Sequence, residues 1–338
     1  MSYLVLARKY RPQTFEAVVD QEHVTRTLSN AIRADRLAHA ILFCGPRGTG
    51  KTTVARILAK AMNCEQGPSA LPCNQCRSCL EITASKAVDV FEIDGASNNS
   101  VDQIRELRDH VKYMPAHGAY KIYIIDEVHM LSTPAFNALL KTLEEPPEHV
   151  LFFFATTEPH KIPVTILSRC QRHDFKRIRM DAIVGHLRRL SEQEGFEVTD
   201  GSLALIAREA GGSMRDALSL LDQITACAED RIDDALVAEL LGSVDRRKIQ
   251  ALIAAVLKRQ ASEMLAIVND VYARGHDIKR LYGEILEYLR NLTVLSNVGT
   301  PERLIDLPAQ EIATMRRQIG ETDPAHIHQV FQLLFQEE

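Results

Sequence analysis

Residues Gly45 to Thr52 constrain the fold of this chain more than any other segment. They satisfy the pattern G-x-x-x-x-G-K-[ST], follow the apolar run AILFC and precede the helix-type sequence TTVARILAKAM. A glycine-rich turn between a strand and a helix directs backbone N–H groups and the positive end of the helix at phosphate. The segment therefore predicts a phosphate-binding loop, in which Lys51 reaches the outer phosphates and the Thr52 hydroxyl binds Mg²⁺. The nucleotide-binding residues predicted in this segment are Gly45, Pro46, Arg47, Gly48, Thr49, Gly50, Lys51, Thr52 and Thr53.

Strand-type and helix-type segments alternate from Ala40 to about Lys176. The strand-type runs are AILFC, VDVFEI, KIYIID, VLFFFATT and a weaker QRHDFK. Strands that alternate with helices pair in parallel through crossover connections. Because these runs are almost continuously apolar, we expect helices to cover both faces of the sheet. The pattern predicts a three-layer α/β domain with a parallel sheet.

The strand signal ends after Ile178, and helix-period segments follow to the end of the sequence. A chain of 338 residues is long enough for two or three domains at ~150 residues each. Glycines at 211, 212 and 242 interrupt the helical pattern. We therefore predict a nucleotide-binding domain with a cysteine module over 1–178, a small helical lid over 179–241 and a helical bundle over 242–338.

Composition and charge narrow the classes of function. Hydrophobic residues make up 46% and charged residues 25% of the chain, as in globular proteins. A net charge of −5 argues against an obligate nucleic-acid coat and allows only local contact with DNA. No apolar run approaches the ~20 residues that cross a bilayer, so the sequence predicts a cytoplasmic protein with no membrane partner.

The run Ile122–Ile125 ends in two carboxylates, Asp126 and Glu127. Acidic residues often end strands simply because they are solvated there. Beside a phosphate loop, however, the first carboxylate can hold Mg²⁺ and the second can polarise a water for attack on the γ-phosphate. We therefore predict that Thr52 and Asp126 bind magnesium and that Lys51, Asp126 and Glu127 are catalytic.

Four of the seven cysteines, Cys64, Cys73, Cys76 and Cys79, lie within sixteen residues. Two C-x-x-C spacings in a loop rich in Pro, Gly, Asn and Ser suit a closed tetrahedral zinc site. Four thiolates leave no open position for catalysis, so the predicted zinc is structural. Unliganded thiols and an iron–sulfur cluster are the alternatives.

Several motifs resemble the gamma/tau subunits of the clamp loader of bacterial DNA polymerase III. They are KYRPQTF, VVDQEHV, GPRGTGKT, the four cysteines, IIDEVHMLS, FNALLKTLEEPP, ATTEPHKIP, ILSRC and GSMRDALS. The resemblance runs from about Leu6 to Asp222 and implies an AAA+ ATPase. The helices beyond it are compatible with the oligomerisation collar of that family.

The resemblance also implies roles for individual residues. The segment from Arg8 to Val19 would line the adenine pocket, with Arg11, Pro12 and Val19 as nucleotide-binding positions. Asp126 and Glu127 would be the Mg²⁺-site acid and the water-activating base.

Three further catalytic residues rest on the resemblance. Thr157 would sense the γ-phosphate, and Arg215 would reach ATP from the lid. Arg169 of Ser-Arg-Cys would be an arginine finger that acts on ATP held by a neighbouring subunit, where its guanidinium spreads positive charge over the transferring phosphoryl group. From the residues alone, Arg169 could be an ordinary surface arginine.

The implied function is a motor subunit that uses ATP, Mg²⁺ and Zn²⁺ and loads a sliding clamp onto primer–template DNA. It would work within a DNA-directed DNA polymerase assembly, beside delta, delta-prime and further gamma/tau copies. Asn98, Asn99 and Lys141 are candidate DNA contacts, because the family tracks duplex phosphates with helix N-termini. Plain N-capping explains the two asparagines as well.

Two other classes of protein share parts of this pattern. A non-hydrolysing assembly module similar to delta-prime has a zinc loop and Ser-Arg-Cys, but its phosphate loop would be impaired, and here Lys51, Thr52, Asp126 and Glu127 are all present. A P-loop nucleotide kinase would need an acceptor-binding lid, and the helical segments after residue 178 contain no obvious motif for one.

Overall fold

The computed structural model describes residues 4–97, 106–107, 110–227, 231–242, 246–299, 304–305, 307 and 309–336. The chain forms two compact units that divide between Arg231 and Ile232. The finer division predicted at residues 178 and 241 stays a prediction.

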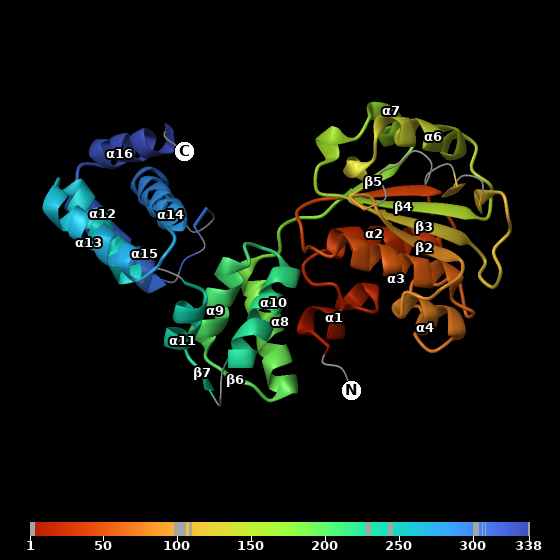
Figure 1. Cartoon of the computed structure of the whole chain (residues 1–338), viewed down its shortest axis with the longest axis horizontal. Helices are drawn as coiled ribbons and strands as arrows, with labels where there is room; N and C mark the ends of the chain where they lie inside the picture. Colours follow the sequence, from red (N-terminus) through yellow and green to blue (C-terminus); the bar gives the residue numbers. More distant parts are fainter. Residues whose placement is uncertain are drawn as a thin grey trace. The chain divides into compact units, whose positions relative to one another are not determined.

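The first unit is built on a parallel sheet of five strands in the order β2-β3-β4-β1-β5 (Figure 1). The strands are β1 (Ala40–Cys44), β2 (Val90–Asp94), β3 (Lys121–Asp126), β4 (Val150–Thr156) and β5 (Gln171–Asp174). Each of the five predicted runs contributes one strand, which confirms the predicted α/β fold class. In this order β1 lies between β4 and β5, with Phe43 opposite both Ala155 and His173.

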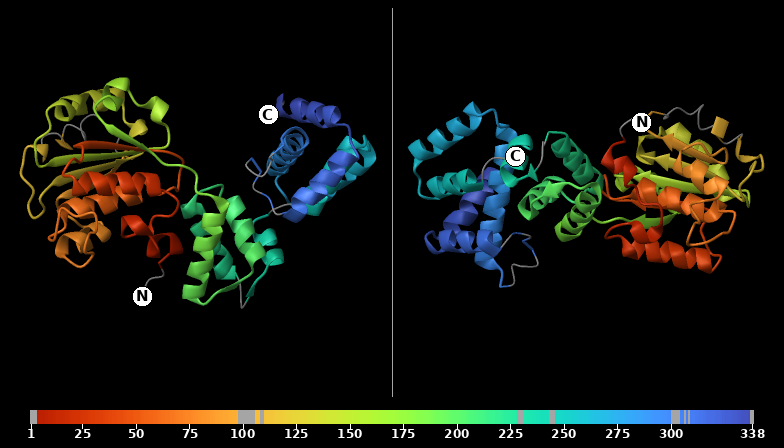
Figure 2. Two further views of the ribbon diagram at one scale, coloured as in Figure 1. Left: turned by 180° about the vertical axis from the view of Figure 1, so that it is seen from behind. Right: turned by 90° about the horizontal axis from the view of Figure 1, so that it is seen from below.

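Helices cover both faces of this sheet (Figures 1 and 2). On one face lie α2 (Glu22–Arg33) and α3 (Lys51–Asn63), and on the other lie α6 (Thr133–Glu144) and α7 (Val164–Leu167). The other short helices that the structure describes before residue 178 are α1 (Leu6–Lys9), η1 (Phe15–Ala17), α4 (Arg77–Thr83), η2 (Val128–Met130) and η3 (Pro159–Lys161).

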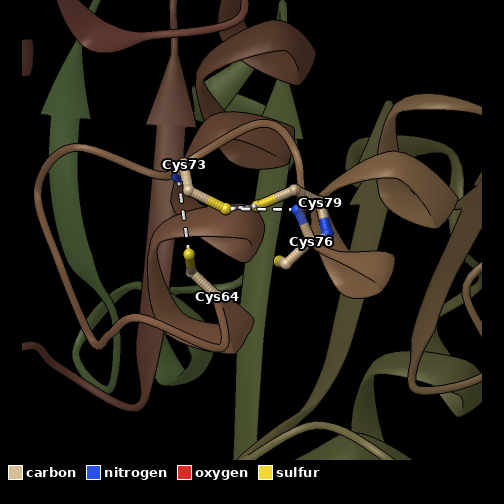
Figure 3. A group of neighbouring side chains, drawn as sticks. All are labelled: Cys64, Cys73, Cys76 and Cys79. Carbon is tan, nitrogen blue, oxygen red and sulfur yellow. Dashed lines mark hydrogen bonds between the residues drawn. The ribbon is translucent and has the colours of Figure 1, made fainter.

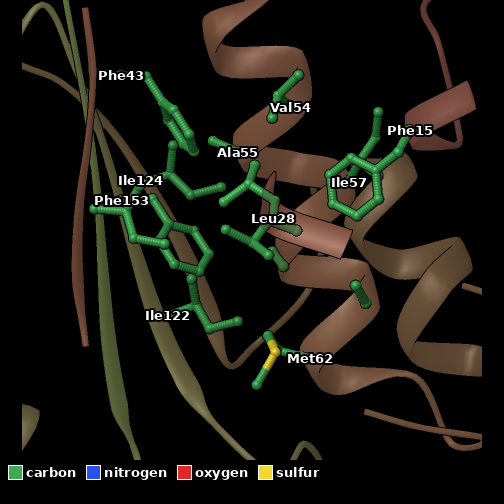
Figure 4. Packing of buried hydrophobic residues seen from close by; sticks show 14 of the residues in the cluster. Phe15, Leu28, Phe43, Val54, Ala55, Ile57, Met62, Ile122, Ile124 and Phe153 are labelled. Atoms are coloured by element: carbon green, nitrogen blue, oxygen red, sulfur yellow. The ribbon is translucent and has the colours of Figure 1, made fainter. Parts of the chain in front are cut away.

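Alternate strand residues enter two separate cores. Phe43, Ile122, Ile124 and Phe153 pack with Leu28 and other residues on the α2–α3 side (Figure 4). Their chain neighbours pack on the α6 side, among them Leu42, Tyr123 and Phe154. Successive side chains of a strand point to opposite faces, so both halves of the three central runs, β1, β3 and β4, must be apolar. This explains why the runs show no alternation in the sequence.

Three longer helices follow the sheet within the first unit. They are α8 (Met180–Glu194), α9 (Asp200–Glu209) and α10 (Met214–Cys227). Gly195 ends α8 in the left-handed conformation, and the Thr199 hydroxyl caps α9. The sequence predicted no strands after Ile178, but two are present, β6 (Glu197–Val198) and β7 (Arg231–Ile232). Strands of two residues are too short to produce a detectable pattern.

The second unit is helical. Its helices are α11 (Asp234–Leu240), α12 (Arg246–Leu257), α13 (Ala261–Ala273), α14 (Ile278–Asn297), α15 (Ala309–Gly320) and α16 (Pro324–Gln336). They share a core that includes Ile253, Leu289, Met315 and Ile327. Among the described residues, no helix combines the length and the apolar character that crossing a membrane requires.

Candidate nucleotide-binding site and cysteine cluster

A cavity of about 370 Å³ opens between the phosphate loop, the N-terminal segment and helix α10. Most of the predicted nucleotide-site residues line it: Arg11, Pro12, Val19, Arg47, Gly48, Thr49, Gly50, Lys51, Thr52, Thr53, Asp126, Glu127 and Arg215. Four predicted residues are not in its lining. Gly45, Pro46 and Thr157 contact residues that are, and Arg169 lies elsewhere.

Two glycines of the loop are required by close contacts. Gly45 has φ +144°, and a Cβ atom there would lie 2.5 Å from the Phe175 carbonyl oxygen. Gly48 has φ +74°, and a Cβ atom there would lie 1.8 Å from Ser213 Oγ. The loop is therefore held tightly against both the sheet and the segment that begins α10.

Lys51 is 6% exposed and lies folded over the loop. Its Nζ donates to the carbonyl oxygens of Gly45 and Pro46, at 2.8 Å each. Burial lowers the pKa of Lys51, and the nearby carboxylates of Glu127 and Asp126 oppose that shift. The loop thus holds a poorly hydrated cation that phosphate oxygens can reach.

The two predicted magnesium ligands are in direct contact. Thr52 Oγ1 donates to Asp126 Oδ2 over 2.7 Å, although the residues are 74 positions apart in sequence. The contact forms because Asp126 is the last residue of β3 and Thr52 is in the first turn of α3. A hydroxyl and a carboxylate oxygen are hard ligands of the kind that Mg²⁺ prefers, so these residues fit the ion.

Glu127 is held in an unusual backbone conformation. Its φ and ψ are +44° and +47°, a left-handed region that costs a non-glycine residue about 1–2 kcal/mol. A Cβ atom on Gly95 would lie 2.7 Å from the Glu127 carbonyl oxygen. Strain of this kind persists where the surroundings over-determine it, often at active sites.

One oxygen of the Glu127 carboxylate takes several contacts. Thr157 donates to Oε2 from its backbone N–H at 3.2 Å and from its hydroxyl at 2.9 Å. His129 Nδ1 lies 3.3 Å from the same oxygen and 3.0 Å from Thr156 Oγ1. On the other edge of the ring, His129 Nε2 lies 3.0 Å from Glu158 Oε2. His129 could not be predicted from the sequence, because one histidine in a turn carries no pattern.

Several arginines make the cavity electropositive. The pKa of Arg11 is lowered mainly by burial and also by the charges of Arg56, Arg215 and Arg8, while Glu92 opposes the shift. Arg215 is positioned by the loop itself, because the backbone N–H groups of Met214 and Arg215 donate to the Gly48 carbonyl at 3.1 and 3.4 Å. Cations brought together in a buried space favour an anionic ligand such as a polyphosphate.

Sequence reasoning missed the lining residues that come from the end of the sheet and from the helices after it. These are Ile178, His186, Met214, Leu218 and Ser219. Only the spacing of residues on α8 and α10 could have pointed to them, and that spacing does not distinguish a core-facing position from a pocket-facing one.

Arg169 has partners within its own chain. Its guanidinium donates to the Thr165 carbonyl at 2.7 Å, to Ser168 Oγ at 3.2 Å and to the Glu144 carboxylate. The side chain is 32% exposed. Arg169 therefore lies outside the chain's own cavity, and its action on a neighbouring subunit stays a prediction.

The four predicted zinc ligands form one cluster (Figure 3). The sulfurs of Cys64, Cys73, Cys76 and Cys79 all lie within 4.8 Å of one another. Tetrahedral zinc with Zn–S bonds of about 2.3 Å needs sulfurs about 3.8 Å apart, and Cys73 Sγ and Cys79 Sγ are 4.0 Å apart. Backbone N–H groups of Gln75 and Cys76 lower the pKa of Cys73 to about 6, which favours the thiolate that a metal binds. The cluster fits a zinc ion.

Of the three candidate DNA contacts, Lys141 is among the described residues and does not line the cavity. Asn98 and Asn99 lie outside the described residues. Lys141 is exposed in the last turn of α6. Its contact with DNA stays a prediction.

The fold and the site together define a protein with a parallel α/β sheet and a P-loop between β1 and α3. Solved structures of Thermotoga maritima RuvB share this fold. The structure described as the RuvB Holliday junction branch migration motor is 18% identical with a TM-score of 0.51, and the match covers 74% of this chain and 80% of that one. At this identity the likeness concerns the fold alone.

Sequence comparisons give the family. Residues 20–179 match the family model described as DNA polymerase III, delta subunit; residues 182–230 match that of the DNA polymerase III clamp loader subunit, ATPase lid domain; and residues 232–337 match DNA polymerase III subunits gamma and tau domain III. The DNA polymerase III subunit gamma of Buchnera aphidicola subsp. Baizongia pistaciae is 38% identical over 295 residues, which are 87% of this chain and 80% of that protein. The chain belongs to the gamma/tau family of DNA polymerase III subunits.

Longer relatives carry the designation tau. That of Bacillus subtilis (strain 168) is 49% identical and that of Escherichia coli (strain K12) is 45% identical, each over 327 residues and 96% of this chain. The chain spans 57% and 50% of their respective lengths.

Proposed function

We propose that this chain is an ATP-hydrolysing motor subunit of a DNA polymerase III clamp loader. The observation that carries the proposal is the meeting of four groups around one electropositive cavity: the Lys51 ammonium, the paired Thr52 and Asp126 oxygens, and the Glu127 carboxylate. Membership of the gamma/tau family supports it.

Each group has a distinct task in hydrolysis. Lys51 and the loop N–H groups bind the outer phosphates, and Glu127 takes a proton from the attacking water. Thr52 and Asp126 would hold Mg²⁺, which neutralises charge on the phosphates when bound. Thr157 orients the Glu127 carboxylate and Arg215 contributes charge from α10. Arg11, Pro12 and Val19 line the space for the adenine.

Assembly completes the site. In this proposal Arg169 acts in trans on the ATP of a neighbour, the helices of 242–338 form the oligomerisation collar, and 179–241 forms the lid. The partners are delta, delta-prime, further gamma/tau copies, the sliding clamp and primer–template DNA, in the cytoplasm.

A non-hydrolysing assembly module similar to delta-prime is less well supported. Such a module would tolerate the loss of the phosphate-loop chemistry, whereas here the loop, the Thr52–Asp126 contact and the strained Glu127 are all in place. The curated relatives described above are gamma and tau subunits.

Two variants test the proposal. Lys51→Ala removes the principal cation for the outer phosphates, so we expect loss of ATP binding in equilibrium titrations. Glu127→Gln keeps the size and polarity of the side chain but removes the base, so we expect ATP binding to persist and turnover to fall, measured with clamp and primed DNA present. Equal ATP affinity in wild type and Lys51→Ala would refute the phosphate-loop assignment.

A further inference from the structure

A buried lysine joins the cysteine cluster to the segment that lines the nucleotide cavity. Lys60, on α3, is 1% exposed. Its Nζ donates to Gln13 O at 2.9 Å, to Gln13 Oε1 at 2.7 Å and to Asn74 Oδ1 at 2.6 Å. A buried ammonium is costly unless its donors are satisfied, so both acceptor residues are fixed in place around it.

Asn74 belongs to the cysteine cluster. It lies between Cys73 and Cys76, and its backbone N–H donates to the Cys79 sulfur. Its φ of +57° is a left-handed conformation that asparagine tolerates better than most residues. The conformation that directs its backbone at a metal-ligand sulfur therefore also determines where its side chain meets Lys60.

Gln13 adjoins the nucleotide cavity through Arg11. Its Nε2 donates to the Arg11 carbonyl at 2.9 Å, and Arg11 and Pro12 line the cavity. Thr83, on α4, also donates to Gln13 Oε1, at 3.2 Å. The base-binding segment is thus held at Gln13 by side chains from α3 and α4.

We propose that Lys60 and Gln13 are positioning residues that couple the cysteine cluster to nucleotide binding, so that a bound metal tightens nucleotide affinity. The inference rests on the proposed function, because it requires that the cavity bind a nucleotide. A metal held by the four sulfurs fixes the hairpin that carries Asn74, Asn74 and Gln13 together fix Lys60, and Gln13 fixes the backbone of Arg11.

Coupling between two sites is reciprocal, and this gives two independent measurements on the full 338-residue chain. One is ATP affinity, by equilibrium titration of zinc-loaded and zinc-depleted protein. The other is zinc affinity, by competition with a zinc-selective chelator with and without ATP. We expect both to change by the same factor, on the order of 5- to 150-fold.

Two variants, Asn74→Gly and Lys60→Met, test whether the coupling between the cysteine cluster and the nucleotide cavity passes through these side chains. Glycine keeps the left-handed backbone at 74 and all four sulfurs, but removes the acceptor; methionine fills the space of Lys60 without its donors. We expect each variant to retain about one zinc per chain, to bind ATP more weakly than wild type, and to show a coupling factor closer to one. Lys86→Met, at an exposed lysine of the same region, is the control and should behave as wild type.

The outcomes separate the two proposals. No change in ATP affinity on zinc removal, or an unchanged coupling factor in both variants, overturns the coupling. If zinc-depleted protein unfolds, the two zinc-loaded variants are compared with zinc-loaded wild type instead. An ATP affinity equal to that of wild type in both variants then overturns the coupling. If wild type and Lys51→Ala both fail to bind ATP, the proposed function is what fails.

Discussion

The contacts of the Glu127 carboxylate converge on a single oxygen, Oε2. Two donors come from Thr157, and His129 lies 3.3 Å away on the other side. His129 is itself set between Glu127 and Glu158, with a side chain only 6% exposed. At the scale of single residues, the orientation of the proposed base therefore depends on a histidine that need not touch the nucleotide.

A prediction for His129 follows from this geometry. His129→Leu removes both ring nitrogens and should leave ATP affinity near wild type while turnover falls about 10- to 100-fold, because a misplaced base reacts poorly. Asparagine presents a polar atom close to the position of Nδ1, so His129→Asn should recover part of the turnover. His160→Leu is the control, since the 73% exposed His160 lies 3.9 Å from the same Glu158. Equal turnover in His129→Leu and His160→Leu would refute the positioning role.

At the scale of elements, helix α3 serves both candidate sites. It begins at Lys51 in the phosphate loop and ends at Asn63, next to the first cluster cysteine, Cys64. The cluster then continues into α4, where the Cys76 sulfur accepts from the Cys79 N–H and caps the helix. A metal in the cluster would therefore fix the C-terminal end of the helix whose N-terminus receives phosphate.

Zinc content tests the cluster directly. Protein purified without chelator should contain about one zinc per chain. Cys76→Ser should lower the zinc content and the melting temperature, because metal binding energy contributes to folding. Cys227→Ser is the control, since Cys227 is an exposed cysteine outside the cluster. Metal analysis and thermal unfolding check both variants, and equal zinc content in the two would exclude the four-cysteine site.

The elements that the sequence predicted well are those whose chemistry is local. The strand runs, the phosphate loop and the cysteine spacing each carry their signal within a few residues. In contrast, β6 and β7 have two residues each and are formed by tertiary contacts. Element boundaries and short strands depend on neighbours that periodicity does not describe.

The parts of the site that could not be predicted depend on residues far apart in the chain. Lys60 looks like a solvent-facing lysine in TTVARILAKAM, and only Gln13 and Asn74, folded over it, explain its burial. His186 enters the cavity from α8, and Glu194 on the same helix contacts Lys9 and Tyr10. The specific roles of Arg215 and Arg169 came from the resemblance, because local sequence patterns do not assign them.

At the scale of the whole molecule, the first unit contains most of the proposed catalytic site, and Arg169 lies outside its cavity. The guanidinium is bound to Thr165 and Glu144 of its own chain. If a neighbour's ATP receives this arginine, turnover depends on assembly. Hydrolysis then occurs only where two subunits meet in the correct geometry.

Mixing two inactive variants tests this dependence. Arg169→Ala should keep its own ATP affinity and lower turnover in the complex by ~10³-fold or more. Glu127→Gln should be inactive because it lacks the base. In assemblies that contain both variants, an interface between an intact Glu127 and an intact Arg169 should restore activity at intermediate mixing ratios, with clamp and primed DNA present. An Arg169→Ala chain that behaves identically in dilute solution and in the assembly would instead be an ordinary surface variant.

The Gly48 carbonyl accepts hydrogen bonds from the backbone N–H groups of the first two residues of α10. These bonds connect the start of that helix directly to the phosphate loop. Helix α10 has 14 residues, which at about 1.5 Å per residue gives a length of ~21 Å. A tilt of ~10° at its first turn would displace its far end by ~4 Å. If the gain or loss of one phosphate group tilted the helix at the loop, the displacement would be larger at Cys227 than at Met214.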